Sequence, residues 1–292
     1  MDSDPPKSEK FSICLFALTG FGNPVLELLV ENSLAPDIVI TKEEKGCYPY
    51  HKEEYLYAMA KRLGVPVFFD EEGRSKVLAN RFDLLITASY HRKLDDSILS
   101  RATNAINIHP SLLPKYRGAS PCFWQIKNGE KTTGVTAHRM TQTFDAGDIL
   151  VQADAPISKK DTQGSLRQKL ALLGGKVALQ ATNALKNKTA KWQSQIDDEA
   201  TYAPLVTDDI YRLDPNQTIA GFCNHLKAAT PYPGGFLKDG LLVTEIVTTR
   251  KTAKAETRQP VGSVTEIGNA LYVLSVKDGE VTFKSSGYRE MV

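Results

Sequence analysis

An amide and an imidazole stand two residues apart in the run from Asn107 to Gly118, the densest cluster of chemically versatile residues in the sequence. Residues 105–109 are typical of a β-strand, and alternation along a strand places the side chains of Asn107 and His109 on one face. Two prolines follow His109 within five residues. The pair therefore lies at the carboxyl end of a predicted parallel strand, where open α/β sheets bind ligands. The two groups could act on one atom; a plain hydrogen-bonded pair at a strand end is the alternative.

Two further segments carry polar motifs. Residues 134–140 have the sequence GVTAHRM, and residues 144–149 have the sequence FDAGDI. Together with the pattern N-x-H-x-S-L-L-P-x-x-R-G in residues 107–118, they resemble in order and spacing the folate-dependent formyltransferases. That family includes methionyl-tRNA formyltransferase, glycinamide ribonucleotide transformylase and the amino-sugar N-formyltransferases. The resemblance covers roughly residues 11–190.

The resemblance implies that N10-formyltetrahydrofolate donates its formyl group to a primary amine, with Asn107, His109 and Asp145 as the catalytic residues. Attack of the amine on the formyl carbon places negative charge on the formyl oxygen, and a neutral amide can hydrogen-bond that oxygen. Such a donor typically contributes about 10²–10³ in rate. His109 can add a second donor or take the proton of the amine. Asp145 can hold His109 in its productive tautomer, although a plain turn aspartate is the alternative for Asp145 alone.

The same resemblance implies that folate is bound largely by backbone around the strand ends, within residues 86–90, 111–114 and 141–145. Loop amides can match the donors and acceptors of a pterin, and two adjacent leucines can form an apolar slot for its ring. Those leucines, Leu112 and Leu113, could instead simply fill the core. The predicted folate contacts are Ile86, Ala88, Tyr90, Ser111, Leu112, Leu113, Pro114, Thr141 and Phe144.

No metal site is expected, because His109, His138 and Asp145 lack the spacing and the second carboxylate or thiolate of a recognisable site. The four cysteines include no C-x-x-C pair and are expected to be reduced thiols. The first ten residues carry charges and two prolines where a secretory signal needs an apolar stretch. The sequence also contains no apolar run long enough to span a membrane. These features predict a cytoplasmic protein.

The composition is that of a folded chain with a full core. The 292 residues are 41% hydrophobic and carry a formal net charge of +2, which argues against disorder and against a general polyanion binder. Short apolar runs alternate with helical segments, as in βαβ units. The expected strands are residues 11–18, 36–40, 66–69, 84–87, 105–109, 133–140 and 149–155, and the expected helices are residues 25–31, 52–63 and 162–185.

This order of elements predicts an α/β fold, with a Rossmann-like, mostly parallel sheet and helices on both faces. The long helix at 162–185 is expected to be broken at Gly174 and Gly175. Residues 1–193 are expected to form the catalytic domain, and the polar, proline-flanked residues 194–215 a linker.

Residues 216–292 are expected to form a small, mostly-β C-terminal domain of the OB-like barrel type. Its expected elements are a helix at 218–229 and strands at 241–248, 261–266, 270–276 and 280–284. The sequences TYAP at 201–204 and PYPG at 231–234 resemble the smaller C-terminal domain of the tRNA and lipid-A-sugar members of the family.

The charge pattern bears on the identity of the acceptor amine. Family members acting on initiator tRNA carry a basic loop with an Arg-Gly-Lys cluster after the second strand, whereas the corresponding residues 41–51 have mixed charge and attract phosphates weakly. Residues 201–292 contain ten basic and ten acidic residues. In contrast, residues 158–195 contain eight Lys or Arg against one acid. That stripe fits tRNA phosphates or, more simply, a solvated helix face.

Residues 86–94 and 138–140 resemble the enzyme that formylates UDP-4-amino-4-deoxyarabinose more than they resemble the tRNA enzymes. The sequence therefore predicts a small-molecule acceptor, such as a nucleotide-linked amino sugar. A methionyl-tRNA formyltransferase is disfavoured but stays open. A formyltetrahydrofolate hydrolase, in which water replaces the amine, also stays open, as does the oligomeric state.

Overall fold

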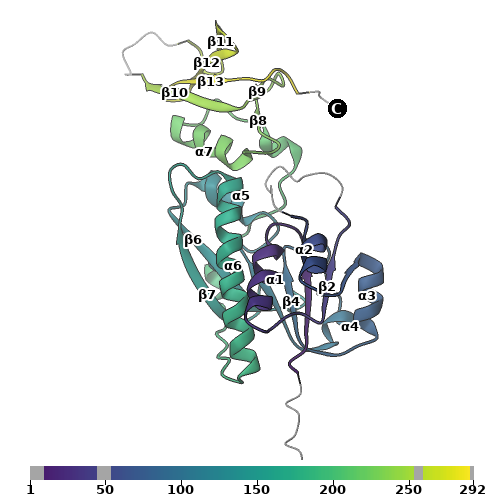
Figure 1. Ribbon diagram of the computed structural model, residues 1–292. Coiled ribbons are helices and arrows are strands. Elements are labelled where there is room, and N and C mark those ends of the chain that lie inside the picture. The colour runs from purple at the N-terminus through teal and green to yellow at the C-terminus, as the bar shows by residue number, and fades with distance from the viewer. Residues whose placement is uncertain (1–9, 45–53, 253–258, 290–292) are drawn as a thin grey trace, which may run out of the picture. The chain divides into compact units, whose positions relative to one another are not determined.

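A seven-stranded β-sheet organises the larger part of the fold (Figure 1). The computed structural model describes residues 10–44, 54–252 and 259–289. The strands have the order β3-β2-β1-β4-β5-β6-β7. Their bounds are Ile13–Ala17 (β1), Ile38–Thr41 (β2), Val67–Phe69 (β3), Phe82–Ala88 (β4), Ala102–His109 (β5), Thr132–Arg139 (β6) and Ile149–Pro156 (β7).

Strand pairing is parallel over most of this sheet. β1 is parallel to β2 and β4, β2 is parallel to β3, and β4 is parallel to β5, whereas β6 runs antiparallel to β5. The order β3-β2-β1-β4-β5, with the first strand in the middle, is that of a doubly wound fold. The predicted Rossmann-like, mostly parallel sheet is therefore confirmed.

Helices cover both faces of the sheet, because its strands are apolar on both sides. Phe16 of β1 belongs to an apolar cluster that includes Val77 of α3 and Ile98 of α4. The next residue, Ala17, points the other way and lies against Gly22 at the start of α1. The helices are Gly22–Glu31 (α1), Leu56–Arg62 (α2), Asp70–Leu78 (α3), Asp96–Leu99 (α4), Pro121–Asn128 (α5), Gln163–Lys186 (α6) and Ile219–Ala229 (α7), with short 3-10 turns at Asp197–Glu199 (η1) and Asp208–Tyr211 (η2).

Helix α6 is continuous, so the predicted break at Gly174 and Gly175 is wrong. A Cβ atom at Gly175 would lie 2.6 Å from the carbonyl oxygen of Pro24, and one at Gly174 would lie 2.8 Å from the ring of Phe21. The missing side chains therefore let the start of α1 approach α6 closely. These glycines serve packing between helices, and the helix tolerates their lower propensity.

Sequence periodicity does not predict α3, α4 or α5. Helix α3 is mostly polar, with only Gly73 and Val77 buried, and α4 has four residues, too few to show a period. Helix α5 starts at Pro121 and is followed directly by Gly129, which has a left-handed φ of 72°. Proline at the first position and glycine just past the end are recognised helix boundaries, so these two residues were the available signal for α5.

The C-terminal β region is antiparallel. Four strands have the order β10-β13-β12-β11, and β8 pairs with β9 in a separate two-stranded sheet. Apolar side chains of these strands pack with α7 in a cluster that includes Phe222, Leu274 and Phe283. The predicted mostly-β character of the C-terminal region is confirmed. The strands are Gly235–Phe236 (β8), Leu242–Val243 (β9), Glu245–Lys251 (β10), Val264–Gly268 (β11), Leu271–Val276 (β12) and Gly279–Lys284 (β13).

The chain folds into two compact units, each made of three segments. The first contains the described parts of residues 1–114, 134–153 and 169–198, and the second those of residues 115–133, 154–168 and 199–292.

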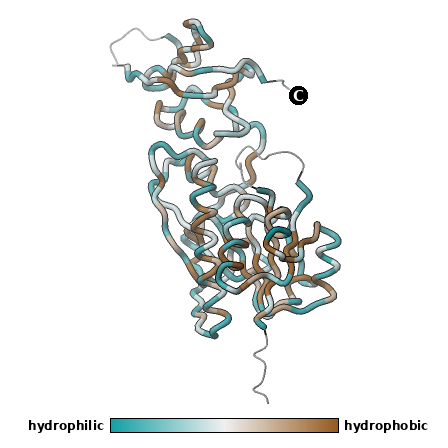
Figure 2. The backbone as a smooth tube through the Cα atoms, in the orientation of Figure 1, coloured by the Kyte–Doolittle hydropathy of each residue, from teal (hydrophilic) through white to brown (hydrophobic). Residues whose placement is uncertain are grey.

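Apolar residues are concentrated in the strands of the large sheet (Figure 2). Within the described ranges, no helix is long and apolar enough to cross a membrane. Cys14, Cys122 and Cys223 are free thiols, as expected, and Cys47 lies outside the described residues.

His225 of α7 is a buried titratable group in the second unit. His225 is only 3% exposed, and its Nε2 lies 2.6 Å from the carbonyl oxygen of Ile210. Nδ1 has no hydrogen-bond partner among the described residues. Burial lowers the pKa of His225 below its usual 6.5, because the charged ring would lose its hydration; the hydrogen bond to Ile210 opposes this shift. The ring is therefore neutral in the folded protein at neutral pH.

We expect acid to destabilise the second unit through His225. Because the pKa is lowered in the folded state, the unfolded chain binds the extra proton. The contribution of His225 to stability is thus present above about pH 6.5 and is lost as the pH falls below it, by up to about 1.4 kcal/mol per pH unit. Urea unfolding between about pH 5 and pH 8 measures this slope. In His225→Gln, whose amide can still donate to Ile210, the slope should be smaller. An unchanged slope would show that other groups cause it.

Candidate active site

Four neighbouring strands place side chains in one row across the sheet. Phe16 of β1 is in register with Thr87 of β4, Thr87 with Asn107 of β5, and Asn107 with His138 of β6. His109 lies two residues beyond Asn107 and so shares its face. The strand register therefore gathers Thr87, Asn107 and His138 near the carboxyl ends of their strands.

One carboxylate oxygen joins this row to the loop after β6. Oδ1 of Asp145 lies 3.3 Å from Nδ2 of Asn107, 3.3 Å from Nε2 of His138 and 3.6 Å from Nδ1 of His109. His109, His138 and Asp145 are only 4%, 2% and 9% exposed. At this depth, interactions between charges are stronger than in water. The structure thus brings together the three residues predicted to be catalytic and adds His138 to them.

Hydrogen bonds fix the orientation of the Asn107 amide. Oγ1 of Thr87 donates to Oδ1 of Asn107 at 2.7 Å, so Nδ2 faces His138 and Asp145. Nδ1 of His138 lies 2.9 Å from the carbonyl oxygen of Arg139. A proton on Nδ1 makes that contact a hydrogen bond and leaves Nε2 of the neutral ring to accept from Asn107. The donor nitrogen of Asn107 is therefore held on the side of the carboxylate.

Thr87 and His138 are site residues that their sequence context does not mark as such. His138 stands in the GVTAHRM motif, and Thr87 ends the strand predicted at 84–87. Neither position shows by itself that its side chain touches Asn107. That contact follows from the register of β4, β5 and β6, which only the structure provides.

The predicted folate contacts are divided between the core and the surface. Ile86, Ala88, Ser111 and Leu113 are buried, Tyr90, Leu112 and Pro114 are partly buried, and Thr141 and Phe144 are exposed. Leu113 is only 3% exposed, so its side chain fills the core, which was the alternative to an apolar slot for the pterin ring. The side chains available to a ligand are therefore chiefly those of Tyr90, Thr141 and Phe144.

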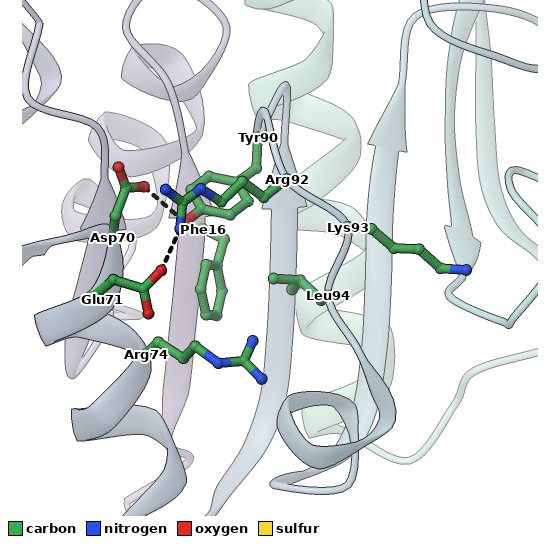
Figure 3. Close-up of a pocket in the computed structure, with 8 residues that line it drawn as sticks. All are labelled: Phe16, Asp70, Glu71, Arg74, Tyr90, Arg92, Lys93 and Leu94. Atoms are coloured by element: carbon green, nitrogen blue, oxygen red, sulfur yellow. Dashed lines mark hydrogen bonds and ion pairs between the residues drawn. The ribbon is translucent and has the colours of Figure 1, made fainter.

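A cavity of about 170 Å³ lies beside Tyr90, in front of the strands β1 and β4 (Figure 3). Oη of Tyr90 donates to Oδ1 of Asp70 at 3.1 Å, and Arg92 pairs with Glu71 at 2.5 Å. Burial raises the pKa of Tyr90, and the bond to Asp70 adds to this shift, so the hydroxyl is protonated at neutral pH. The cavity is lined by Phe16, Asp70, Glu71, Arg74, Tyr90, Arg92, Lys93 and Leu94.

This cavity is separate from the trio of predicted catalytic residues, Asn107, His109 and Asp145, because none of them lines it. It is also smaller than the roughly 300–1,000 Å³ of most ligand pockets. Lys93 lies 5.1 Å from the ring centroid of Phe144 and so connects the cavity wall to the loop of Asp145.

The site places an amide nitrogen and two imidazole nitrogens within 3.6 Å of one carboxylate oxygen. Such a set can stabilise negative charge on an oxygen and move a proton, the two requirements of addition to a carbonyl carbon. Although two imidazoles and a carboxylate meet here, the part of the chain that the structure describes holds no group of three His, Cys, Asp or Glu residues arranged to bind a metal ion.

Comparison with known proteins agrees with this chemistry. Residues 42–182 match the family model for formyl transferase. The methionyl-tRNA formyltransferase of Latilactobacillus sakei is 32% identical over 278 residues, which are 92% of this chain and 87% of that protein. The methionyl-tRNA formyltransferase of Macrococcus caseolyticus is 32% identical over 281 residues, or 91% of this chain and 87% of that protein.

Two solved structures share the fold. The N-formyltransferase of Helicobacter canadensis, in complex with folinic acid and dTDP-3-aminofucose, has a TM-score of 0.75 at 18% identity and covers 94% of this chain and 99% of its own. The sugar 3N-formyl transferase WlaRD, studied with dTDP and 5-N-formyl-tetrahydrofolate, has a TM-score of 0.70 at 18% identity, with 97% and 99% covered.

The fold and the site together define an enzyme of folate-dependent formyl transfer. The chain belongs to the formyltransferase family, whose members take the formyl group from N10-formyltetrahydrofolate. The resemblance inferred from the three motifs is thereby confirmed. The two relatives found by sequence are named methionyl-tRNA formyltransferases. The two similar structures are of N-formyltransferases, and one of them was crystallised with a nucleotide-linked amino sugar.

We expect Thr87→Val to lower kcat about 10-fold, because the loss of one hydrogen bond worth about 1.4 kcal/mol lets the Asn107 amide turn over. Valine keeps the shape of the buried side chain, so thermal unfolding should change little. Thr87→Ser retains the hydroxyl and should stay within about 3-fold of the wild-type kcat. Steady-state formyl transfer from N10-formyltetrahydrofolate measures both variants. A wild-type kcat in Thr87→Val would mean that the amide is oriented by other contacts.

Proposed function

We propose that this chain transfers the formyl group of N10-formyltetrahydrofolate to the primary amine of a small acceptor through Asn107, His109 and Asp145. One observation carries the proposal: nitrogen atoms of three side chains surround Oδ1 of Asp145 within 3.6 Å. A buried carboxylate next to an amide and two imidazoles can orient the groups that transfer protons and balance their charge.

Asn107 acts as the donor to the formyl oxygen. Its Nδ2 carries two hydrogens, one directed at His138 and one at Asp145. A formyl oxygen bound beside the second hydrogen can accept it in place of Asp145 while the bond to His138 persists, and the hydroxyl of Thr87 keeps the amide from turning over. The donor then stabilises the negative charge that develops as the amine attacks, an effect typically worth about 10²–10³ in rate.

His109 acts as the base for the attacking amine. The bond between the amine nitrogen and the formyl carbon forms, the bond from the formyl carbon to N10 of the folate breaks, and the proton taken from the amine is returned to N10. Atoms and charge therefore balance, with His109 serving first as base and then as acid. Asp145, whose Oδ1 lies 3.6 Å from Nδ1 of His109, favours the protonated ring between the two transfers.

The folate contacts proposed for this reaction are the segments that include Ile86, Ala88, Tyr90, Ser111, Leu112, Leu113, Pro114, Thr141 and Phe144. The proximity of Lys93 to Phe144 supports a path from the cavity at Tyr90 to the loop of Asp145. The proposal assigns the chemistry to residues 1–193, with residues 194–215 as the connection to a C-terminal domain at 216–292, and a cytoplasmic location.

A nucleotide-linked amino sugar is the proposed acceptor. Residues 201–292 carry equal numbers of acidic and basic residues, so they supply no net attraction for the phosphates of a nucleic acid. Initiator methionyl-tRNA is the second candidate, favoured by the names of the relatives by sequence and by exposed basic side chains in and after α6, at Lys176, Lys186, Lys188 and Lys191. Of the segment 41–51, whose mixed charge argues against a nucleic acid, residues 45–51 lie outside the described residues.

We expect Asn107→Ala, His109→Ala and Asp145→Ala each to lower kcat by at least about 10²-fold, because each removes a group proposed to act in the transition state. Circular dichroism and thermal unfolding should show a folded chain. Asn183→Ala, an equivalent substitution at an exposed position of α6, should leave kcat unchanged. Formyl transfer at a near wild-type rate by Asp145→Ala would contradict the proposed role of the trio.

The acceptor can be identified with a panel of amines and N10-formyltetrahydrofolate as donor. We expect tetrahydrofolate to be released with a nucleotide-linked amino sugar and not with buffer alone. Release without any amine would identify a hydrolase. Formylation of initiator methionyl-tRNA, with binding that weakens steeply between low and moderate salt in a band-shift assay, would identify the tRNA enzyme.

A further inference from the structure

A short segment after α6 is fastened to the loop that carries Asp145. The backbone of Gln193 and that of Ile149 exchange two hydrogen bonds, of 2.7 and 2.8 Å. The hydroxyl of Ser194 donates to the carboxylate of Asp148 at 2.9 Å. The guanidinium of Arg139 lies 4.0 Å from the ring centroid of Trp192. Contacts along three consecutive residues of the segment thus reach the chain on both sides of Asp145, at Arg139 before it and at Asp148 and Ile149 after it.

Gln195 makes the contacts that reach Asp145 itself. Its Nε2 donates to the carbonyl oxygen of Asp145 at 2.8 Å and to that of Gly147 at 2.7 Å. An amide nitrogen has two hydrogens, so one side chain can serve both carbonyl groups. A carboxylate of the same shape would face the two carbonyl oxygens with acceptors only and would repel them.

The backbone that Gln195 holds is one that needs outside support. Asp145 has a φ of +54°, in the left-handed region, which costs an ordinary residue about 1–2 kcal/mol. Such conformations persist where surrounding contacts over-determine them. Just after it, Gly147 lies so close to the carbonyl oxygen of Arg139 that a Cβ atom could not be accommodated. The turn is therefore fixed on both sides of Asp145.

The conformation of this turn determines the position of the Asp145 carboxylate. Its Oδ1 is within 3.6 Å of nitrogen atoms on β5 and β6, and a displacement of about 1 Å at such a centre can cost about 10²-fold in rate. The amide hydrogens of Gln195 are donated to the backbone of the turn, at the carbonyl groups of Asp145 and Gly147.

We infer that Gln195 is a positioning residue for formyl transfer: its amide fixes the left-handed turn at Asp145 and thereby holds the carboxylate against His109 and Asn107. The inference rests on the proposed function, because it concerns the residue proposed to assist His109. It assigns a role in the active site to a polar segment 50 residues away from Asp145 in the sequence.

The test uses two substitutions of similar shape, Gln195→Met, which removes both donors, and Gln195→Glu, which replaces them with acceptors. Ser194→Ala is the matched control, because it removes a hydrogen bond from the same segment to Asp148 and not to Asp145. The assay measures kcat and KM for N10-formyltetrahydrofolate with the amine of the panel that the wild-type chain formylates fastest. Amide hydrogen exchange in residues 141–148 gives a measurement that needs no acceptor.

We expect kcat to fall about 10-fold in Gln195→Met and about 10²-fold in Gln195→Glu, with KM within about 3-fold of wild type and faster exchange in residues 141–148. Ser194→Ala should stay within about 2-fold in kcat. A residue that merely stabilised the fold would not separate kcat from KM. Combined with Asp145→Asn, Gln195→Met should cause no further loss, since it acts through the same carboxylate.

A wild-type kcat in Gln195→Glu, with Asp145→Asn inactive, would overturn the inference and leave the proposed function in place. Conversely, a wild-type chain that formylates no amine of the panel would overturn the proposed function. In that case unchanged exchange of residues 141–148 in Gln195→Glu would overturn the inference as well, and faster exchange would support the hold of Gln195 on the turn.

Discussion

The buried negative charge of Asp145 is the constraint around which the site is built. A carboxylate that is only 9% exposed loses much of its hydration, and the hydrogen bond from the Asn107 amide and the nearby Nδ1 of His109 compensate for part of this loss. The same contacts orient the groups proposed to react. Charge compensation and alignment are therefore one network, so a change to any member disturbs both.

The sheet provides this network because strands from distant parts of the chain lie in register. β4 brings Thr87 beside Asn107, and the antiparallel β6 brings His138 to the other side. Apolar side chains on both faces of the strands anchor them to helices above and below. The loop after β6 then has only to present one carboxylate, and its left-handed turn at Asp145 directs that carboxylate back over the strands.

The sequence predicts the parts of this molecule whose signals are local. Apolar runs bounded by turn residues mark the strands, and the resemblance of three motifs to a known family implies Asn107, His109 and Asp145, which the fold brings together. Thr87 lies outside that reach because a strand threonine gives no sign of its cross-strand partner. Gln195 sits in a polar stretch, and only tertiary structure shows its bonds to a turn 50 residues away. Gly174 marks a helix contact where propensity alone indicates a break.

Catalysis also depends on how the chain folds, because the site needs one row of residues in register across four strands: Phe16, Thr87, Asn107 and His138. A slip of one residue between two strands would turn every side chain of the displaced strand to the opposite face, and Asn107 would then point away from both of its neighbours. A sheet that is incomplete or misaligned therefore lacks the active site altogether and does not form a less active one. Enzymatic competence should emerge only once all four strands have found their final alignment.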